Sequence, residues 1–297
     1  MRTFILGTDW WTDCDDAVAL RLLTRFIKDK KIQLLGIAIN GCMPDSVASL
    51  KGFLLADGVE HIPIGIDLDA TDFGGRPPYQ KRLAADFAPH VTNQDAEDAV
   101  RLYRRLLAGL EQKTEILEIG YLQVFSALLN SPPDDISDKT GFELVRDKVR
   151  KVWAMAGKWD ADGEKENNFC RNSRSRVAGW EFCRRCPVPV TFLGWEVGYN
   201  VITGTDLDER DHLYRVLVDH GSPKGRSSWD PMLVLMALIG DEAAAGYKTV
   251  TGQASVDPDT GANHFVVDPN GRHKYVIKTQ ANEYYAEQIH QYLGKFD

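Results

Sequence analysis

The sequence predicts an α/β protein with a mostly parallel central sheet and helices on both of its faces. Apolar runs of strand length alternate with helical segments through most of the 297 residues. The run 32–39 is apolar almost throughout, as parallel strands covered on both faces are. Polar residues follow the strands directly, where α/β proteins bind ligands. Because no linker or internal repeat interrupts the pattern, residues 1–297 are expected to form one domain.

The first half of the chain alternates regularly until one long interruption. Period-two and continuous apolar runs predict strands at 4–6, 32–39, 62–66 and 114–119, and helical periodicity predicts helices at 15–28, 45–58, 94–111 and 122–129. Between 67 and 93 the pattern fails at Gly74-Gly75 and Pro77-Pro78, so we expect a long surface loop there.

The second half begins with a polar excursion after Pro132-Pro133 and ends in a β-rich segment. The patterns predict strands at 149–155 and 188–193, a polar loop at 160–168, and helices at 173–185, 206–219, 230–240 and 281–293. Between the last two helices, short β-type stretches near 250, 265–267 and 275–277 are separated by glycine and proline.

Charge and cysteine usage exclude several classes of function. The net charge of −8 argues against nucleic acid or an anionic membrane as the main partner, because both require a basic surface. No transmembrane-length apolar stretch or signal peptide is recognisable, and five cysteines without a disulfide-scaffold spacing favour the reducing cytoplasm. Cys183 and Cys186 end a helical pattern, unlike a redox motif, and a lone pair lacks half of a zinc site.

The turn after the first strand is the richest polar feature of the sequence. Within eight positions it carries Asp9, Asp13, Asp15 and Asp16, directly before an apolar helical segment. Carboxylates this crowded repel one another unless a cation neutralises them, and Ca²⁺ and Mg²⁺ are the cations that prefer oxygen ligands. Asp13 or Asp15 alone could be a helix cap, but one cap does not account for four acids. The turn therefore predicts a metal site that takes further ligands from elsewhere.

Three other polar clusters follow strands or begin helices. Asn40 follows the second predicted strand, where an asparagine can either form a turn or contact a ligand. The segment 164–169, Glu-Lys-Glu-Asn-Asn-Phe, offers carboxylates and amides suited to a polyhydroxylated ligand, although such loops are normally just solvated. Asp230 before Pro231 has the features of a helix N-cap, whereas the neighbouring Trp229 could stack on a planar ligand.

The first turn and the Trp-Asp-Pro helix start together resemble the inosine-uridine-preferring nucleoside hydrolase family. The chain reads Gly-Thr-Asp-Trp-Trp-Thr-Asp-Cys-Asp-Asp-Ala-Val-Ala-Leu over 7–20, which is close to the family variant with an Asp-Cys-Asp-Asp segment. It lacks the first acid of the usual Asp-x-Asp and is two residues longer than the common Asp-Pro-Gly-x-Asp-Asp form. Asn40 matches the family's asparagine, 120–123 stands where the family has Gly-Pro-Leu-Thr, and 166–169 resembles its Glu-x-Asn-Phe.

This resemblance implies a Rossmann-like nucleoside hydrolase fold and Ca²⁺-dependent hydrolysis of the N-glycosidic bond of ribonucleosides. Carried over to this chain, the metal ligands are Asp9, Asp16, the carbonyl at Gln123, and Asp230. Ribose contacts fall to Asp15, Asn40, Glu166 and Asn168. The implied mechanism has Ca²⁺ positioning a water whose proton Asp9 accepts as general base, followed by an oxocarbenium-like transition state.

The residue before the late aspartate indicates the preferred base. Pyrimidine-tolerant members place a histidine there, whereas the purine-preferring branch carries a tryptophan, as this chain does with Trp229. The resemblance therefore implies purine ribonucleosides as substrates, with Trp229 activating the base by stacking. Trp10, Trp11 or Tyr79 would supply the second face of an aromatic sandwich. Asp13, in the inserted part of the turn, is left without a role, and Asn172 replaces a usual aspartate.

Two alternatives to hydrolysis belong to other classes. A Ca²⁺-dependent nucleoside- or ribose-binding protein without turnover would carry the same ligand residues. A Mg²⁺ phosphotransferase is disfavoured because the chain has no Gly-x-x-x-x-Gly-Lys loop and no Asp-x-Asp directly after the first strand. The family resemblance further implies a homodimer or homotetramer acting on small-molecule nucleosides.

Overall fold

The protein is built on one large, mostly parallel sheet. The computed structural model describes residues 1–75 and 78–294, so Pro77 of the expected loop lies outside the described residues. Within them the main sheet has the order β4 (Glu97–Asp98), β3 (Ile64–Ile66), β2 (Ile32–Ile39), β1 (Arg2–Thr8), β5 (Thr114–Glu118), β6 (Val149–Met155), β8 (Val190–Leu193), β13 (His273–Lys278), β11 (Tyr247–Val256), β12 (Ala262–Val267) and β7 (Glu164–Lys165). All pairs from β4 to β13 are parallel, and the β13–β11–β12–β7 end is antiparallel.

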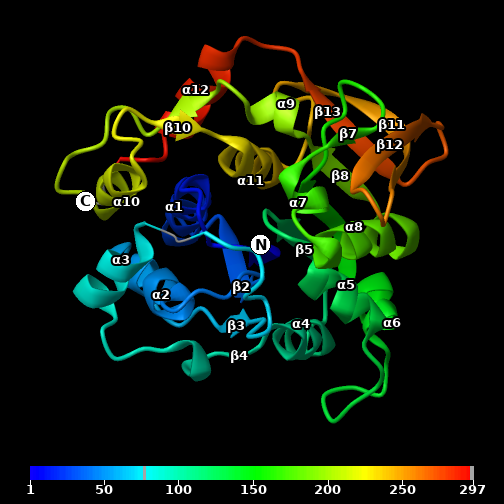
Figure 1. Ribbon diagram of the computed structural model, residues 1–297, viewed down its shortest axis with the longest axis horizontal. Helices are drawn as coiled ribbons and strands as arrows, with labels where there is room; N and C mark the ends of the chain where they lie inside the picture. The colour runs from blue at the N-terminus through cyan, green and yellow to red at the C-terminus, as the bar shows by residue number, and fades with distance from the viewer. Residues whose placement is uncertain (76–77, 295–297) are drawn as a thin grey trace.

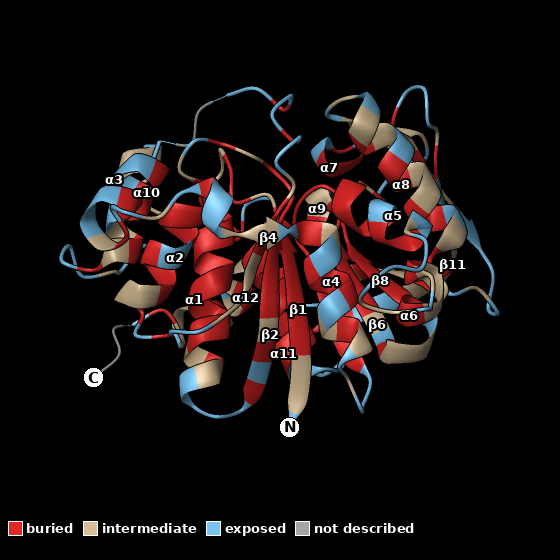
Figure 2. Ribbon diagram, turned by 90° about the horizontal axis from the view of Figure 1, so that it is seen from below, coloured by how far each residue is buried: buried red, intermediate tan, exposed pale blue. Residues whose placement is uncertain are grey.

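Helices cover both faces of this sheet, as expected (Figures 1 and 2). One face carries α1 (Asp15–Lys28), α2 (Ser46–Ala56), α10 (His212–His220), α11 (Trp229–Ile239) and α12 (Asn282–His290). The other carries α4 (Ala99–Ala108), α5 (Gln123–Asn130), α6 (Gly141–Lys148) and α8 (Ser173–Arg185). Smaller elements are α3 (Gln80–Phe87), η1 (Asn93–Asp95), α7 (Asn167–Cys170), α9 (Trp195–Gly198), and the strands β9 (Ile202–Thr203) and β10 (Arg226–Ser227), which pair with each other.

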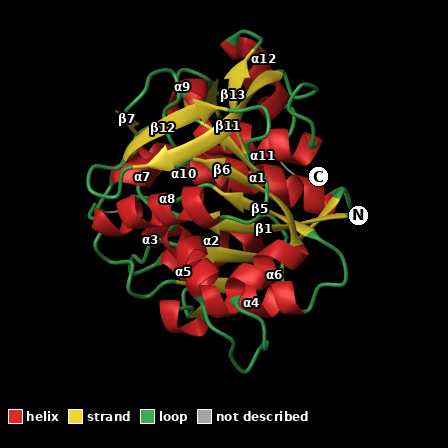
Figure 3. Ribbon diagram, turned by 90° about the vertical axis from the view of Figure 1, so that its right-hand side faces the viewer, coloured by secondary structure: helices red, strands yellow, loops and turns green. Residues whose placement is uncertain are grey.

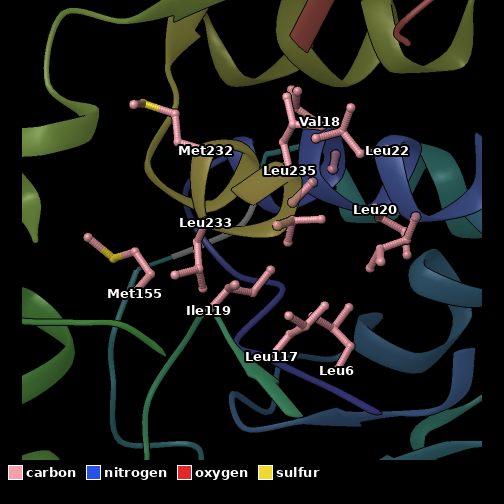
Figure 4. Close-up of a cluster of buried hydrophobic side chains, with 14 of the residues drawn as sticks. Leu6, Val18, Leu20, Leu22, Leu117, Ile119, Met155, Met232, Leu233 and Leu235 are labelled. Carbon is pink, nitrogen blue, oxygen red and sulfur yellow. The ribbon is translucent and has the colours of Figure 1, made fainter. Parts of the chain in front are cut away.

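Strand β1 lies at the centre of the sheet and contributes to both cores. Phe4 and Leu6 face the core under α1 and α11, whereas Ile5 faces the core under α4 and α5, as the period-two geometry of a strand requires. Figure 4 shows side chains from α1 and α11 packed against each other and above those of β1 and β5. This packing fixes the start of α1 and the start of α11 over the carboxyl end of β1.

Most expected elements are present, and the differences have local causes. The expected loop at 67–93 contains α3, whose buried Leu83 and Ala84 pack toward α2, so the expectation of a long surface loop was wrong over α3. The polar excursion contains α6, which begins with a capping box in which Thr140 and Glu143 bond each other's backbone N–H groups. The β-rich segment forms the antiparallel strands β11 to β13 (Figure 3).

Cys183 and Cys186 are free thiols buried in the core at the end of α8. Within the described residues, no helix combines the length and the apolar character that crossing a bilayer requires.

A buried ion cluster ties α1 to the helices beside it, and it generates a stability prediction. Arg21 is 1% exposed and pairs with Asp57 at 2.9 Å and Asp211 at 2.7 Å. Arg21→Ala leaves both carboxylates buried without their guanidinium, so the free energy of unfolding should fall by about 3–5 kcal/mol. Urea denaturation measures this loss.

The matched control is Arg101→Ala, which breaks a bidentate pair with Asp135 on the exposed surface. It should change the free energy of unfolding little, because exposed ion pairs contribute little. Equal effects of the two variants would contradict the assignment of a structural role to the buried cluster.

Candidate active site

The ends of three neighbouring strands meet around Asp9. Asp9 follows β1, and the turns after β2 and β5 approach its backbone from either side. A Cβ at Gly120 would lie 2.3 Å from the Asp9 nitrogen, and one at Gly41 would lie 2.9 Å from the Asp9 carbonyl oxygen. These two positions therefore require glycine, and the sequence motifs after β2 and β5 are explained by close packing against the first turn.

Three buried aspartates are brought together by the starts of two helices. Asp15 and Asp16 lie in the first turn of α1, and Asp230 lies in the first turn of α11. A carboxylate oxygen from each lies within 4.8 Å of the other two. Their side chains are buried to 3–4% exposure, and residues 215 positions apart thus form one cluster.

Backbone and hydroxyl donors hold these carboxylates in place. The Oδ2 atom of Asp15 accepts hydrogen bonds from the N–H groups of Trp229 and Asp230, each at 3.1 Å. Asp16 accepts one from the Thr8 hydroxyl and one at 3.3 Å from the Trp10 N–H. Because acids are favoured at helix N-termini, both helix starts stabilise this arrangement, but neither neutralises it.

The electrostatics show how strongly the cluster lacks positive charge. Burial, followed by repulsion from Asp15 and Asp13, raises the pKa of Asp9 to about 8. Burial and the neighbouring carboxylates likewise hold the pKa values of Asp15, Asp16 and Asp230 well above the usual range. Clustered carboxylate oxygens fit a hard divalent cation, which would restore the ionised forms of these acids.

A cavity of about 250 Å³ opens above these acids. It is lined by Asp9, Trp11, Thr12, Asp13, Asp15, Asp16, Ile119, Met155, Glu166, Asn167, Asn168, Trp195, Arg226, Trp229 and Asp230. The structure therefore brings together seven of the nine site residues expected from the sequence. The cavity volume lies just below the range of about 300–1,000 Å³ that is typical of small-molecule pockets.

Glu166 and Asn168 reach the cavity from the start of α7. Glu166 caps this short helix, with Oε1 accepting from the Asn168 N–H at 2.9 Å and Oε2 from the Gly157 N–H at 3.0 Å. Burial raises the pKa of Glu166 to about 7. The Asn168 amide donates to the Met155 carbonyl at 2.8 Å, which fixes the orientation of its side chain beside the acids.

Two expected site residues do not line the cavity. Asn40 is fully buried, and its Oδ1 accepts from the Tyr121 N–H at 3.0 Å, so it holds the β2 and β5 turns together. Gln123 donates to the Asn40 carbonyl and lines a separate cavity beside α8. From the segment 119–123, it is Ile119 that lines the acidic cavity.

The aromatic residues of the first turn point in different directions. Trp10 is 1% exposed, contacts Phe53 and Tyr79 edge-on, and donates from Nε1 to Ser49 at 2.8 Å. Trp10 and Tyr79 therefore belong to the core rather than to a base sandwich. Trp11 is the residue of this group that lines the cavity. Trp10 has a positive φ of 43°, which turns the chain so that successive tryptophans diverge.

Trp229 belongs to an aromatic row that the sequence did not reveal. Its ring stacks at 6.4 Å on Trp195, which in turn stacks at 4.5 Å on Tyr199. The Trp229 indole N–H donates to the Trp195 carbonyl at 2.7 Å, which fixes the ring at the cavity wall. Trp195 begins α9 directly after β8, and its position at a strand end was the one available signal.

The structure also gives Asp13 partners that the sequence did not indicate. Asp13 accepts hydrogen bonds from Arg226 at 2.6 and 2.9 Å, and His220 Nε2 lies 3.8 Å from it. Arg226 stands four residues before the late aspartate and also lines the cavity. Nothing in the local pattern separates this arginine from a solvated one, because its partner is 213 residues away.

Comparisons with known proteins place this geometry within one fold. No family model and no curated protein matches the sequence. A plant nucleoside hydrolase matches with a TM-score of 0.72 and 16% identity, covering 98% of each chain. A purine-preferring ribonucleoside hydrolase from Gardnerella vaginalis matches at 0.70 and 17%, again over 98% of each chain. A type III effector protein complexed with adenosine diphosphate ribose matches at 0.65 and 15%, over 97% of this chain and 92% of that one.

These likenesses confirm the expected fold: the chain has the α/β fold of the nucleoside hydrolases. At 15–17% identity these likenesses establish the fold, and the chemistry of the site depends on its own residues.

The acidic cluster generates a prediction about pH and metal removal. In the metal-free protein Asp9 and Glu166 keep their protons up to about pH 8 and about pH 7, whereas an unfolded chain loses them near their ordinary values of 3.8 and 4.5. The folded state then binds more protons, so the free energy of unfolding should fall as pH rises through this window. In EDTA, thermal denaturation should give a lower Tm at pH 8 than at pH 5.

Added Ca²⁺ should raise the Tm more at pH 8 than at pH 5, because at pH 8 the acids are ready to ionise around the ion. Asp230→Asn should abolish this Ca²⁺ effect, whereas the exposed Asp135→Asn should retain it. An equal Ca²⁺ shift at both pH values would contradict a metal site built from these carboxylates.

Proposed function

We propose that this protein hydrolyses the N-glycosidic bond of ribonucleosides, preferentially purine ribonucleosides, in a Ca²⁺-dependent reaction. The observation that carries the proposal is the convergence of four carboxylates, Asp9, Asp15, Asp16 and Asp230, with Glu166 and Asn168 in one cavity of a nucleoside hydrolase fold. Such a cavity offers carboxylate oxygens as ligands for a cation and hydrogen-bonding groups for a sugar.

The proposed metal ligands are Asp9, Asp16, Asp230 and a backbone carbonyl at the end of β5. For this carbonyl ligand Ile119 is a better candidate than Gln123, because Ile119 lines the cavity. The backbone carbonyl is the only oxygen atom that an isoleucine has. A hard cation held there supplies positive charge that keeps these acids ionised and polarises a water molecule.

The remaining steps, which are proton acceptance, ribose binding and charge stabilisation, are assigned to residues of the chain. Asp9 accepts the proton of the attacking water as general base, and the water oxygen bonds to C1′ of the ribose. Glu166, Asn168 and the unbonded side of Asp15 bind ribose hydroxyls. As the bond from C1′ to the base breaks, positive charge develops on the ribose, and the surrounding carboxylates stabilise it. The base leaves with the bonding electron pair and takes a proton from solvent.

The tryptophans that line the cavity, here called the aromatic wall, support the proposed preference for purine bases. Trp229 is held at the cavity wall by its bond to Trp195, and Trp11 lines the cavity from the first turn. Indole rings stack on nucleobases, and the two-ring purines offer the larger stacking area.

The direct test is base release from inosine, adenosine, guanosine and uridine, with Ca²⁺ and with EDTA. Purines should be hydrolysed faster than uridine, and EDTA should abolish the reaction. Asp9→Asn should lower kcat by about 10²–10⁴-fold, the usual contribution of a general base. Asp135→Asn, on the exposed surface, should be indistinguishable from the natural protein.

Absence of base release from all four nucleosides would overturn the hydrolase proposal. Tight Ca²⁺-dependent nucleoside binding without turnover, unaffected by Asp9→Ala, would instead identify a binding protein. That alternative is supported by the effector of the same fold that was solved with adenosine diphosphate ribose.

Stacking generates a separate prediction. Trp11→Ala should reduce kcat/KM for inosine by about 5- to 100-fold, the range expected for a lost aromatic–base contact. The control is Trp180→Ala in α8, whose ring contacts Arg184 outside the cavity. Steady-state kinetics of both variants decide the point, and an unchanged kcat/KM in Trp11→Ala would remove Trp11 from the base site.

A further inference from the structure

The ion pair between Asp13 and Arg226 joins the inserted part of the first turn to the strand that precedes α11. Arg226 Nε donates to Asp13 Oδ1 at 2.9 Å, and Nη2 donates to Oδ2 at 2.6 Å. Both residues line the cavity, with about one-third of each side chain exposed. The guanidinium also lies 5.4 Å from the centre of the Trp229 ring. The pair therefore stands next to the aromatic wall.

The pairing geometry leaves part of the guanidinium available. A guanidinium carries five N–H donors, and Asp13 takes one on Nε and one on Nη2. No hydrogen bond joins Nη1 to residues 1–75 or 78–294 of the chain. The outer edge, formed by Nη1 and the second N–H of Nη2, is thus a two-donor fork on a residue that lines the cavity.

The charge balance indicates what such a fork would bind. Asp13 already neutralises Arg226, and Asp9, Asp15, Asp16 and Asp230 make the cavity strongly acidic. A phosphate would be repelled there, whereas a neutral group with two adjacent acceptors would not. In nucleobases, N7 and O6 of a 6-oxopurine form such a pair, and an arginine fork binds both at once.

We propose that Arg226, positioned by Asp13, recognises the N7–O6 edge of a 6-oxopurine base. This inference rests on the proposed hydrolase function and deepens it, because it assigns inosine and guanosine as the preferred substrates. Adenosine presents an amino group at position 6, and this donor would face the donors of Arg226. The insertion in the first turn thereby acquires a role: it carries the carboxylate that orients the arginine.

The same contact favours departure of the base. When the bond from C1′ to N9 breaks, its electron pair passes to the purine and negative charge spreads onto N7 and O6. Arg226 keeps its protons and stabilises this charge through the two hydrogen bonds. A substrate whose leaving group is already stable and carries no N7–O6 edge gains nothing from Arg226. 4-Nitrophenyl β-D-ribofuranoside is such a substrate.

The experiment measures kcat/KM with Ca²⁺ for three substrates: inosine, adenosine and 4-nitrophenyl β-D-ribofuranoside. The proteins compared are the natural protein and the variants Arg226→Gln, Asp13→Asn and Arg101→Gln. Arg226→Gln should lower kcat/KM for inosine by about 10- to 100-fold, the discrimination expected for a bidentate arginine contact. Activity on adenosine and on the nitrophenyl riboside should change less than threefold. Arg101→Gln breaks an equivalent bidentate pair on the surface and should change none of the three.

Asp13 is tested as a positioning residue. Asp13→Asn should lower the ratio of inosine to nitrophenyl riboside activity in the same direction as Arg226→Gln. The double variant should be no worse than Arg226→Gln alone, because the two residues act as one unit. A merely structural role of Asp13 would lower activity on all substrates together.

The results separate this inference from the proposed function. The assignment of Arg226 is overturned if Arg226→Gln lowers kcat/KM equally for all three substrates, or if the natural protein does not prefer inosine to adenosine. Either result leaves hydrolysis itself established. A natural protein inactive on all three overturns both. If Arg226→Gln does not fold, the natural protein and Arg226→Lys are compared on inosine and 7-deazainosine, which lacks N7. In the natural protein kcat/KM should be at least about tenfold higher for inosine than for 7-deazainosine. Arg226→Lys should lower this ratio. An unchanged ratio overturns the assignment.

Discussion

Repulsion among the buried carboxylates at the end of β1 is the constraint on which the rest of the site depends. Asp15, Asp16 and Asp230 have carboxylate oxygens within 4.8 Å of one another, and Asp9 joins them in the same cavity. Bringing like charges together out of water costs free energy, as the raised pKa values of these acids record. The arrangement is stable only because the surrounding fold holds it rigidly and because protons or a cation can balance the charge.

The packing of α1 against α11 supplies that rigidity. The two helices bury apolar faces against each other and against β1 and β5, so their first turns cannot move apart without opening the core. The same packing directs two N–H groups at the start of α11 toward Asp15. Two helix N-termini thus face one group of acids, and this partly offsets the repulsion, while protons or a cation balance the remaining charge.

The first turn also contributes residues of different kinds to the cavity. Asp9 and Asp16 line the cavity with Asp230 of α11, and Trp11 and Asp13 line it as well, with Asp13 bonded to Arg226. Trp10, between Asp9 and Trp11, is anchored in the core by Ser49 and turns the chain through a left-handed conformation. One turn therefore carries acids of the proposed cation site together with Trp11, proposed to stack on the base, and Asp13, proposed to orient Arg226.

The sequence by itself determined the strand and helix pattern, the parallel sheet and the acidic turn, because these follow from local periodicity and from the spacing of charges within a few residues. It also singled out Asp230, through a helix-start motif. The direction in which each side chain points was decided only by the tertiary structure: Trp10 turned inward, Gln123 and Asn40 bracing the turns outside the cavity, and Ile119 taking the place beside the acids. The partnership of Asp13 with Arg226 likewise joins residues 213 positions apart, and no local pattern encodes a contact that exists only after the sheet and its helices have packed.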